Sequence, residues 1–303
     1  MMKLIPPAAV ACLALALTAS AQDDSARDRP LGEDVVRVSD HVWAIIGYPN
    51  VGIVVGTEAT LVVDTGLGPR NGATVARVAR RLAPANKLYL TTTHIHPEHT
   101  TGDAGFPPDT TLIRPRAQQD ELEKSGAAMV RLFEGMNPRW REWLADARPR
   151  APDLTFDREH RLDLGGGVAA RLLWFGGAHT KGDELTFVAP DRTLIAGDVV
   201  QNKVAPNIFG DGGTPSSWLA VLDEVAKLDA AHVLPPHSPP GDGTLVAREK
   251  DFILDLRTRA LDLKRQGVDA AKAGEQLAAE FRAKYPGWNL GTLPAFVAKV
   301  YAE

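Results

Sequence analysis

The stretch TTTHIHPEHTTGD, residues 91–103, places three histidines and two acids directly after a β-branched run. His94 and His96 stand two residues apart after the strand-like segment LYLTTT, so in extended backbone their side chains leave on the same side. The proline that follows suits the first position of a helix, which turns Glu98 and His99 back toward the same opening. This spacing predicts a metal site at the end of a strand.

Three further candidate ligands follow predicted strands in the second half of the chain. They are His179 in GGAHTKGD, Asp198 in LIAGD and His237 in HVLPPHSPPG. Imidazole and carboxylate without thiolate suit Zn²⁺, Fe or Mn, and Zn²⁺ is the commonest match for hydrolytic sites rich in histidine. The alternative is a surface loop that is rich in histidine by chance. Each further candidate ligand at the end of a predicted strand makes this alternative a poorer explanation. The remaining histidines, 41, 160 and 232, are expected to be structural or exposed, although one of them could support a ligand.

The first 21 residues predict a secretory signal peptide. Lys3 is followed by an apolar run over residues 8–18 and by ASA before Gln22. The apolar run is too short to span a bilayer comfortably, which favours a cleaved signal over an uncleaved anchor. We therefore expect a secreted or periplasmic protein whose mature chain begins near residue 22 and has no membrane span.

The composition limits which metal ligands and which partners the mature chain can have. The 303 residues are 44% apolar, enough for a sizeable core in one large domain or two small ones. The single cysteine, Cys12, lies inside the predicted signal peptide, so thiolate ligands and disulfides are excluded. Without residues 1–21, which hold one lysine and no acid, 33 basic side chains face 38 acidic ones, and nucleic acid is not an expected partner.

Strands and helices alternate in a pattern that occurs twice. After a loose segment over residues 22–34, strands are predicted in 35–47, 51–66 and 87–93, with an amphipathic helix in 69–86. The second set has strands in 154–164, 168–176, 184–190 and 193–198, then a helix in 214–229 capped by Ser216 or Ser217. ATLVVDTG and RTLIAGD stand at equivalent places in the two sets, which indicates two halves packed as a sandwich of sheets.

Two helical regions lie outside this pattern. A helical insertion is predicted at about 116–148, and its Phe133, Met136, Trp140 and Trp143 could form a wall over a substrate pocket. Ordinary packing of an amphipathic helix is the preferred interpretation. A C-terminal extension over residues 246–303 is predicted as two or three amphipathic helices around YPGWNLG, with no chemistry of its own.

On these residues the chain resembles the metallo-β-lactamase fold superfamily, whose motif is H-x-H-x-D-H followed by a His, an Asp and a final His. The resemblance covers roughly residues 35–241 and implies an α/β domain over 35–245, a four-layer αββα sandwich with metals at one edge of two sheets. It also implies a ligand set: His94, His96 and His179 on a first metal, His99 and His237 on a second, and Asp198 bridging. Asp64, in VVDTG, is implied to be structural support near the site.

One position departs from the motif, because Glu98 stands where the family has aspartate. Its carboxylate can still ligate the second metal only if the loop or the metal shifts to accommodate the extra methylene. The resemblance implies two zinc ions whose bound hydroxide acts as nucleophile, with Glu98 and Asp198 as catalytic residues that orient water or accept its proton.

We therefore predict a secreted zinc-dependent hydrolase that cleaves an amide, lactam, lactone or other ester-type bond in a small molecule. The predicted hydrolase is β-lactamase-like, but the ligands alone do not favour β-lactam hydrolysis, since the thiolate-free lactamases differ at the position of Asp198. An iron-dependent oxidoreductase of the same fold and a metal-binding protein without turnover are the alternatives, which metal analysis and activity would separate.

Overall fold

The computed structural model describes residues 27–210 and 212–303. The predicted signal peptide and residues 22–26 of the predicted N-terminal segment lie outside the described residues. Among the residues that are described, no helix combines the length and the hydropathy needed to cross a bilayer.

A first sheet is built from the N-terminal half of the chain. Its seven described strands lie side by side in chain order, antiparallel from the first to the fourth and parallel from the fourth to the seventh. They are β1 (Val36–Arg37), β2 (Val42–Ile45), β3 (Val51–Val55), β4 (Ala59–Val63), β5 (Lys87–Thr91), β6 (Thr111–Pro115) and β7 (Leu154–Phe156).

A second sheet follows in the C-terminal half. Its six described strands lie in the order β13-β12-β11-β10-β9-β8, antiparallel except for the parallel pair β11 and β12. They are β8 (Glu159–Gly165), β9 (Val168–Leu173), β10 (Leu185–Ala189), β11 (Thr193–Ile195), β12 (His232–Leu234) and β13 (Gly241–Asp242).

The segment 154–164, predicted as one strand, is divided between the sheets. β7 pairs in parallel with β6, and the chain then crosses within two residues to β8 in the second sheet. Both pieces have β-like composition, and only their pairing partners separate them. The single-strand prediction is therefore wrong, because pairing between distant strands is not visible in local periodicity.

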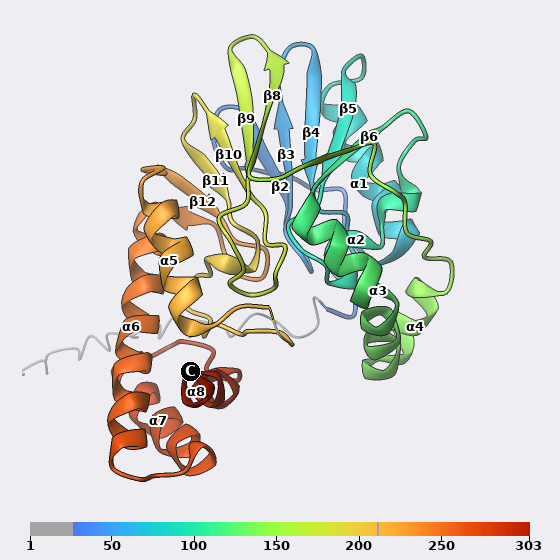
Figure 1. Cartoon of the computed structure of the whole chain (residues 1–303). Helices are drawn as coiled ribbons and strands as arrows, with labels where there is room; N and C mark the ends of the chain where they lie inside the picture. The colour runs from blue at the N-terminus through green and yellow to red at the C-terminus, as the bar shows by residue number, and fades with distance from the viewer. Residues whose placement is uncertain (1–26, 211) are drawn as a thin grey trace, which may run out of the picture.

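The two sheets pack face to face and helices cover their outer faces (Figure 1). Between the sheets, Leu61 and Val63 of the first meet Leu172 and Val188 of the second. The helix α1 (Gly68–Leu82) packs on the outer face of the first sheet, and α5 (Pro215–Ala226) and α6 (Thr244–Arg265) pack on that of the second. This arrangement confirms the predicted four-layer sandwich.

The N-terminus of α5 differs from the prediction. Thr214, and neither Ser216 nor Ser217, is the N-cap, and its Oγ1 accepts a hydrogen bond from the backbone N–H of Ser217 at 3.0 Å. The Ser217 hydroxyl in turn accepts from the N–H of Thr214 at 2.8 Å, which completes a capping box. Pro215 occupies the first helical position, where its missing N–H costs nothing, so the helix starts earlier than a serine cap would allow.

The two regions outside the sandwich, the insertion and the C-terminal extension, are helical as predicted. The insertion contains α3 (Arg116–Met136) and α4 (Pro138–Leu144), and the extension adds α7 (Ala270–Lys284) and α8 (Leu293–Ala302) after α6. YPGWNLG joins α7 to α8. Three short helices, α2 (Pro97–Thr100), η2 (Asp103–Gly105) and η3 (Gly197–Val199), lie in loops at strand ends.

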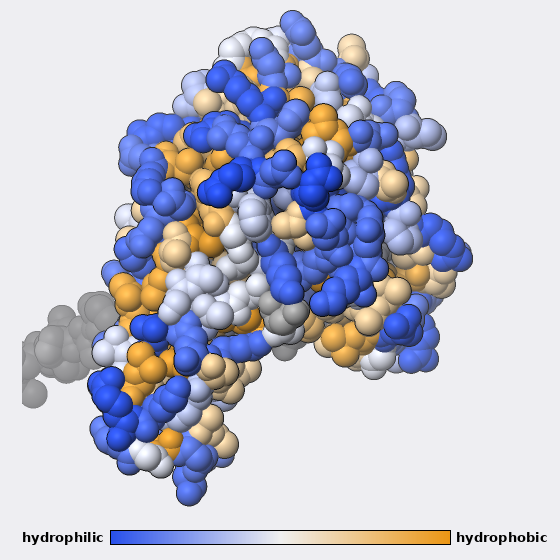
Figure 2. Space-filling model, viewed as in Figure 1, coloured by the Kyte–Doolittle hydropathy of each residue, from blue (hydrophilic) through white to orange (hydrophobic). Residues whose placement is uncertain are grey.

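In Figure 2, hydrophilic side chains cover most of the viewed face, and apolar ones are exposed in separate patches. The large apolar side chains that remain exposed among the described residues are distributed over several elements: Val36, Ile46, Leu132, Met136, Leu154 and Leu254. Most large apolar side chains of the described chain are instead buried in the layers of the sandwich.

Candidate metal centre

The predicted ligands meet at one edge of the sandwich. His94 and His96 follow β5, and Glu98 and His99 lie in α2. From the second half of the chain, His179 lies in the loop before β10, Asp198 in η3 after β11, and His237 in the loop after β12. The first of these residues, His94, and the last, His237, are 143 residues apart in sequence, and the fold brings all seven side chains together in two groups.

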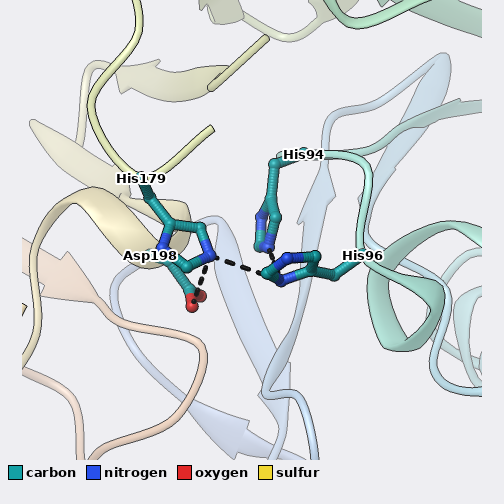
Figure 3. A group of neighbouring side chains, drawn as sticks. All are labelled: His94, His96, His179 and Asp198. Atoms are coloured by element: carbon teal, nitrogen blue, oxygen red, sulfur yellow. Dashed lines mark hydrogen bonds and ion pairs between the residues drawn. The ribbon is translucent and has the colours of Figure 1, made fainter. Parts of the chain in front are cut away.

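The first group consists of His94, His96, His179 and Asp198, each with a potential ligand atom within 4.8 Å of the others. His96 Nδ1 lies 3.0 Å from His94 Nε2 and 3.3 Å from His179 Nε2 (Figure 3). His179 Nε2 also lies 3.4 Å from Asp198 Oδ2. The His179 ring is nearly perpendicular to both other rings, at 89° and 88°, so the nitrogens converge without stacking of the imidazoles.

The second group consists of Glu98, His99 and His237. The Nε2 atoms of the two histidines are 3.2 Å apart, and Glu98 Oε1 lies 3.8 Å from each of them. Asp198 faces this group as well, because its Oδ1 is 3.5 Å from His237 Nε2 and 3.9 Å from His99 Nε2. One oxygen of Asp198 is thus directed to each group, which is the arrangement that a carboxylate shared by two cations requires.

The glutamate at the motif's aspartate position reaches the second group with help from a distant tyrosine. Glu98 is the second residue of α2, and the hydroxyl of Tyr48 donates a hydrogen bond to its Oε1 at 3.2 Å. The Tyr48 ring also lies 4.6 Å from the His237 ring. Tyr48 was not a predicted site residue, since nothing in its local sequence relates it to residue 98.

Asp64 belongs to neither group and instead orients a ligand. Its Oδ2 lies 2.8 Å from Nδ1 of His99, and its Oδ1 accepts from the backbone N–H of Thr93 at 2.7 Å. With Nδ1–H donating to a carboxylate, Nε2 of His99 is the nitrogen left with a lone pair, and it faces the second group. Asp64 reaches this place with φ of 74°, a left-handed conformation that aspartate tolerates better than most residues.

A further carboxylate supports the first group. Asp183 is buried and accepts hydrogen bonds from the backbone N–H groups of Ala178, His179 and Thr180, at 2.8 to 3.1 Å. The loop that carries His179 is therefore fixed by its own aspartate, four residues further along the chain. Nδ1 of His179 lies 2.5 Å from the carbonyl oxygen of Asn207, so its Nε2 faces the other ligands. Asp183 is not among the predicted site residues, although AHTKGD carries the short spacing of an aspartate turn.

The other histidines stay outside both groups. Nδ1 of His41 lies 2.6 Å from Oδ1 of Asp191, a contact between the turn before β2 and the turn between β10 and β11. His160 lies beside the Phe156 ring, at 6.1 Å between centroids, and His232 is exposed.

Burial and mutual charge set the ionisation of the ligands. Burial lowers the pKa of His94 and His96, and that of His237 to about 3, which keeps these rings in the neutral form that binds metal. Burial opposes the charged form of Asp198, but the surrounding histidines hold its pKa at about 2. Burial raises the pKa of Glu98 to about 6.

His99 behaves differently from the other rings. Burial acts to lower its pKa, yet the carboxylates of Asp64, Glu98 and Asp198 together raise it to about 9. The second group is therefore built to hold positive charge, which makes it suited to a cation.

The unpartnered atoms of the site support the same fit. Of the carboxylate oxygens in these groups, Glu98 Oε2 and Asp198 Oδ1 are buried without a hydrogen-bond partner among the described residues. Buried polar atoms without a partner are rare in folded proteins. A donor set of five imidazoles and two carboxylates without thiolate suits a divalent transition metal such as Zn²⁺, Fe or Mn.

Comparison with known proteins adds independent information. The family model of the Metallo-beta-lactamase superfamily matches residues 45–237. Acyl-coenzyme A thioesterase MBLAC2 of Gallus gallus is 26% identical over 160 residues, covering 51% of this chain and 53% of the thioesterase. The chain thus spans about half the length of this curated relative.

Solved structures show the same fold at low identity. A metallo-beta-lactamase from Pontibacter korlensis has a TM-score of 0.59 at 18% identity, covering 73% of this chain and 99% of that one. The stereoselective inverting sec-alkylsulfatase Pisa1 from Pseudomonas sp. has a TM-score of 0.67 at 17% identity, covering 88% of this chain and 49% of that one.

Proposed function

The chain belongs to the metallo-beta-lactamase superfamily, and on that premise we propose that it is a secreted, zinc-dependent hydrolase with two metal ions. The observation that carries this proposal is the position of Asp198, whose two oxygens face the two ligand groups. His94, His96 and His179 would hold the first ion, and Glu98, His99 and His237 the second. Secretion rests on the N-terminal sequence alone.

The reaction we propose is hydrolysis of an amide, lactam, lactone or other ester-type bond in a small molecule. When bound, the zinc ions supply Lewis acidity, which polarises the scissile group and lowers the pKa of water to about 7. The side chains of Glu98 and Asp198 orient the attacking water and accept its proton. Water oxygen bonds to the acyl carbon, the bond to the leaving atom breaks, and the proton passes to that atom, giving an acid and an alcohol, thiol or amine.

Two of the ligand side chains are partly accessible to solvent. The side chains of Asp198 and His237 are 14% and 12% exposed, whereas those of Glu98, His99 and His179 are at most 4% exposed. A substrate approaching from solvent therefore meets the shared carboxylate first. The names of the thioesterase, lactamase and sulfatase relatives support hydrolysis as the reaction class and leave the bond to be determined.

The test begins with elemental analysis of the purified full chain, for which we expect two zinc ions and little iron per molecule. The same sample is then assayed against a β-lactam, a lactone, a thioester and a phosphodiester, with turnover expected on at least one of the first three. His179→Ala should lose zinc and turnover together. The matched control is His232→Ala, an exposed histidine outside both groups. A His179→Ala protein with full zinc and full rate would refute the assignment.

A further inference from the structure

Four aromatic side chains, here called the aromatic arc, line one side of the metal centre: Tyr48, Phe133, Trp140 and Phe209. Phe209 meets the ring of His96 edge-on at 4.5 Å, and Phe133 lies 5.9 Å from the same histidine. Phe133 stacks on Trp140 at 5.3 Å between centroids. Rings of the arc therefore contact a ligand of the first group directly.

The arc continues to the second group. Trp140 stacks on Tyr48 at 5.7 Å with an angle of 15° between the rings, and Tyr48 in turn lies 4.6 Å from His237. The aromatic rings thus form a continuous path from His96 in the first group to His237 in the second. A molecule bound across both groups would have this path beside it.

The arc is assembled from three separate parts of the chain. Phe133 and Trp140 come from α3 and α4 of the insertion, Tyr48 from the loop between β2 and β3, and Phe209 from the loop after η3. Phe133 and Trp140 are also part of the apolar core of the insertion, together with Leu67 and Leu144. That packing accounts for two of the rings.

Phe209 lies outside that core, and Tyr48 packs against its edge. Tyr48 and Phe209 are only partly buried, and each lies against a ligand histidine. The nearby side chains of Asp198 and His237 are the most exposed carboxylate and imidazole of the centre, so this side faces solvent. Arg27, whose guanidinium lies 5.1 Å from the Tyr48 ring centroid, places a cation at the edge of the arc.

We propose that the substrate of this site carries an apolar acyl group, which packs on the aromatic arc while its carbonyl carbon lies at the metal centre. This inference rests on the proposed function and names its substrate class. Phe209 and Tyr48, the two partly buried rings of the arc, are then specificity-determining residues, because aromatic side chains provide large apolar contact areas at low entropic cost. The insertion supports this surface from behind, because Trp140 stacks on Tyr48.

The test uses the product-like carboxylates acetate, butyrate, hexanoate and octanoate, titrated calorimetrically into the zinc-loaded full chain. Each methylene that the arc covers should tighten binding about fourfold. We therefore expect hexanoate to bind at least about tenfold more tightly than acetate, and Phe209→Ser to remove most of that difference while zinc content stays unchanged. Phe209→Leu, which keeps an apolar side chain, should retain more of it.

The control is Met136→Ser, an exposed apolar residue of the insertion that is not part of the arc; it should leave the chain-length dependence intact. Equal affinity for acetate and octanoate in the wild-type protein would overturn the proposal, as would a chain-length dependence that survives Phe209→Ser. Because carboxylate binding needs no turnover, a chain-length preference without hydrolysis would contradict only the proposed function.

Discussion

The replacement Tyr48→Phe tests how the glutamate of the motif is held in place. The Tyr48 hydroxyl donates to Glu98 Oε1 at 3.2 Å, while its ring lies against His237 and Trp140. Phenylalanine keeps the ring and its contacts and removes only the hydroxyl. The variant therefore isolates one hydrogen bond to a buried carboxylate.

The size of the effect follows from that geometry. A hydrogen bond to a charged group contributes about 1.5 to 3 kcal/mol. The 3.2 Å separation is longer than is usual for O–H···O, which places this bond at the low end of that range. About 1.5 kcal/mol corresponds to roughly tenfold weaker zinc binding at the second group. The first group has no contact with the hydroxyl and should keep its affinity.

Competition titration with a chromophoric zinc chelator measures the two affinities separately. Tyr89→Phe is the matched control, since Tyr89 lies on β5 and its ring contacts Lys87. In a Glu98→Asp background the effect of Tyr48→Phe should shrink, because the shorter side chain draws the carboxylate away from the hydroxyl. Equal weakening of both groups, or an unchanged second group, would refute the reasoning.

Three other predictions concern the support of the site and of the fold. Asp64→Asn should weaken zinc binding at the second group about 10- to 100-fold in the same titration, because His99 loses its charged partner, and an unchanged affinity would contradict this. Burial raises the pKa of Glu184 from 4.5 to about 8, so the neutral acid stabilises the fold fully below about pH 4.5 and this contribution is lost as the pH rises to 8. Glu184→Gln should flatten the decline in unfolding free energy between pH 5 and pH 8.5, measured by denaturation in urea with a chelator present; a slope equal to that of the wild type would count against it. Phe252→Ala should cost about 3 to 5 kcal/mol of unfolding free energy, since Phe252 is fully buried in α6, whereas the exposed Leu254→Ala should cost well under 1 kcal/mol; similar losses would show that α6 does not pack as described.

The local half of the site could be predicted from sequence because it depends on backbone geometry. His94 and His96 share a side by the alternation of extended chain, and the proline before Glu98 begins α2 as expected. The partners His179, Asp198 and His237 follow strands of a different sheet. Their position beside the first histidines depends on how two sheets pack, which local periodicity does not encode.

The two places where the fold differs from the prediction also depend on tertiary packing. Segment 154–164 has the composition of one strand, yet its first residues pair with β6 and the rest with β9. The sequence predicts a serine cap for α5 because serine is a favoured N-cap residue, but Pro215 fixes the start of the helix one residue after Thr214. In both cases several local solutions were acceptable, and packing selected one.

The position of Glu98 depends both on its own side-chain length, which is visible in the sequence, and on its tertiary surroundings, which are not. The extra methylene of glutamate predicts a displaced carboxylate, and whether that displacement disrupts a site depends on what surrounds it. Here α2 brings Glu98 toward the second group, and a tyrosine fifty residues earlier in the chain meets its carboxylate. In the first group, by contrast, the contacts that hold His179 involve the backbone. Its N–H donates to Asp183, and its ring nitrogen Nδ1 contacts the carbonyl oxygen of Asn207. Because side chains from loops support the second group and backbone contacts support the first, the second site should be the weaker and more adjustable of the two.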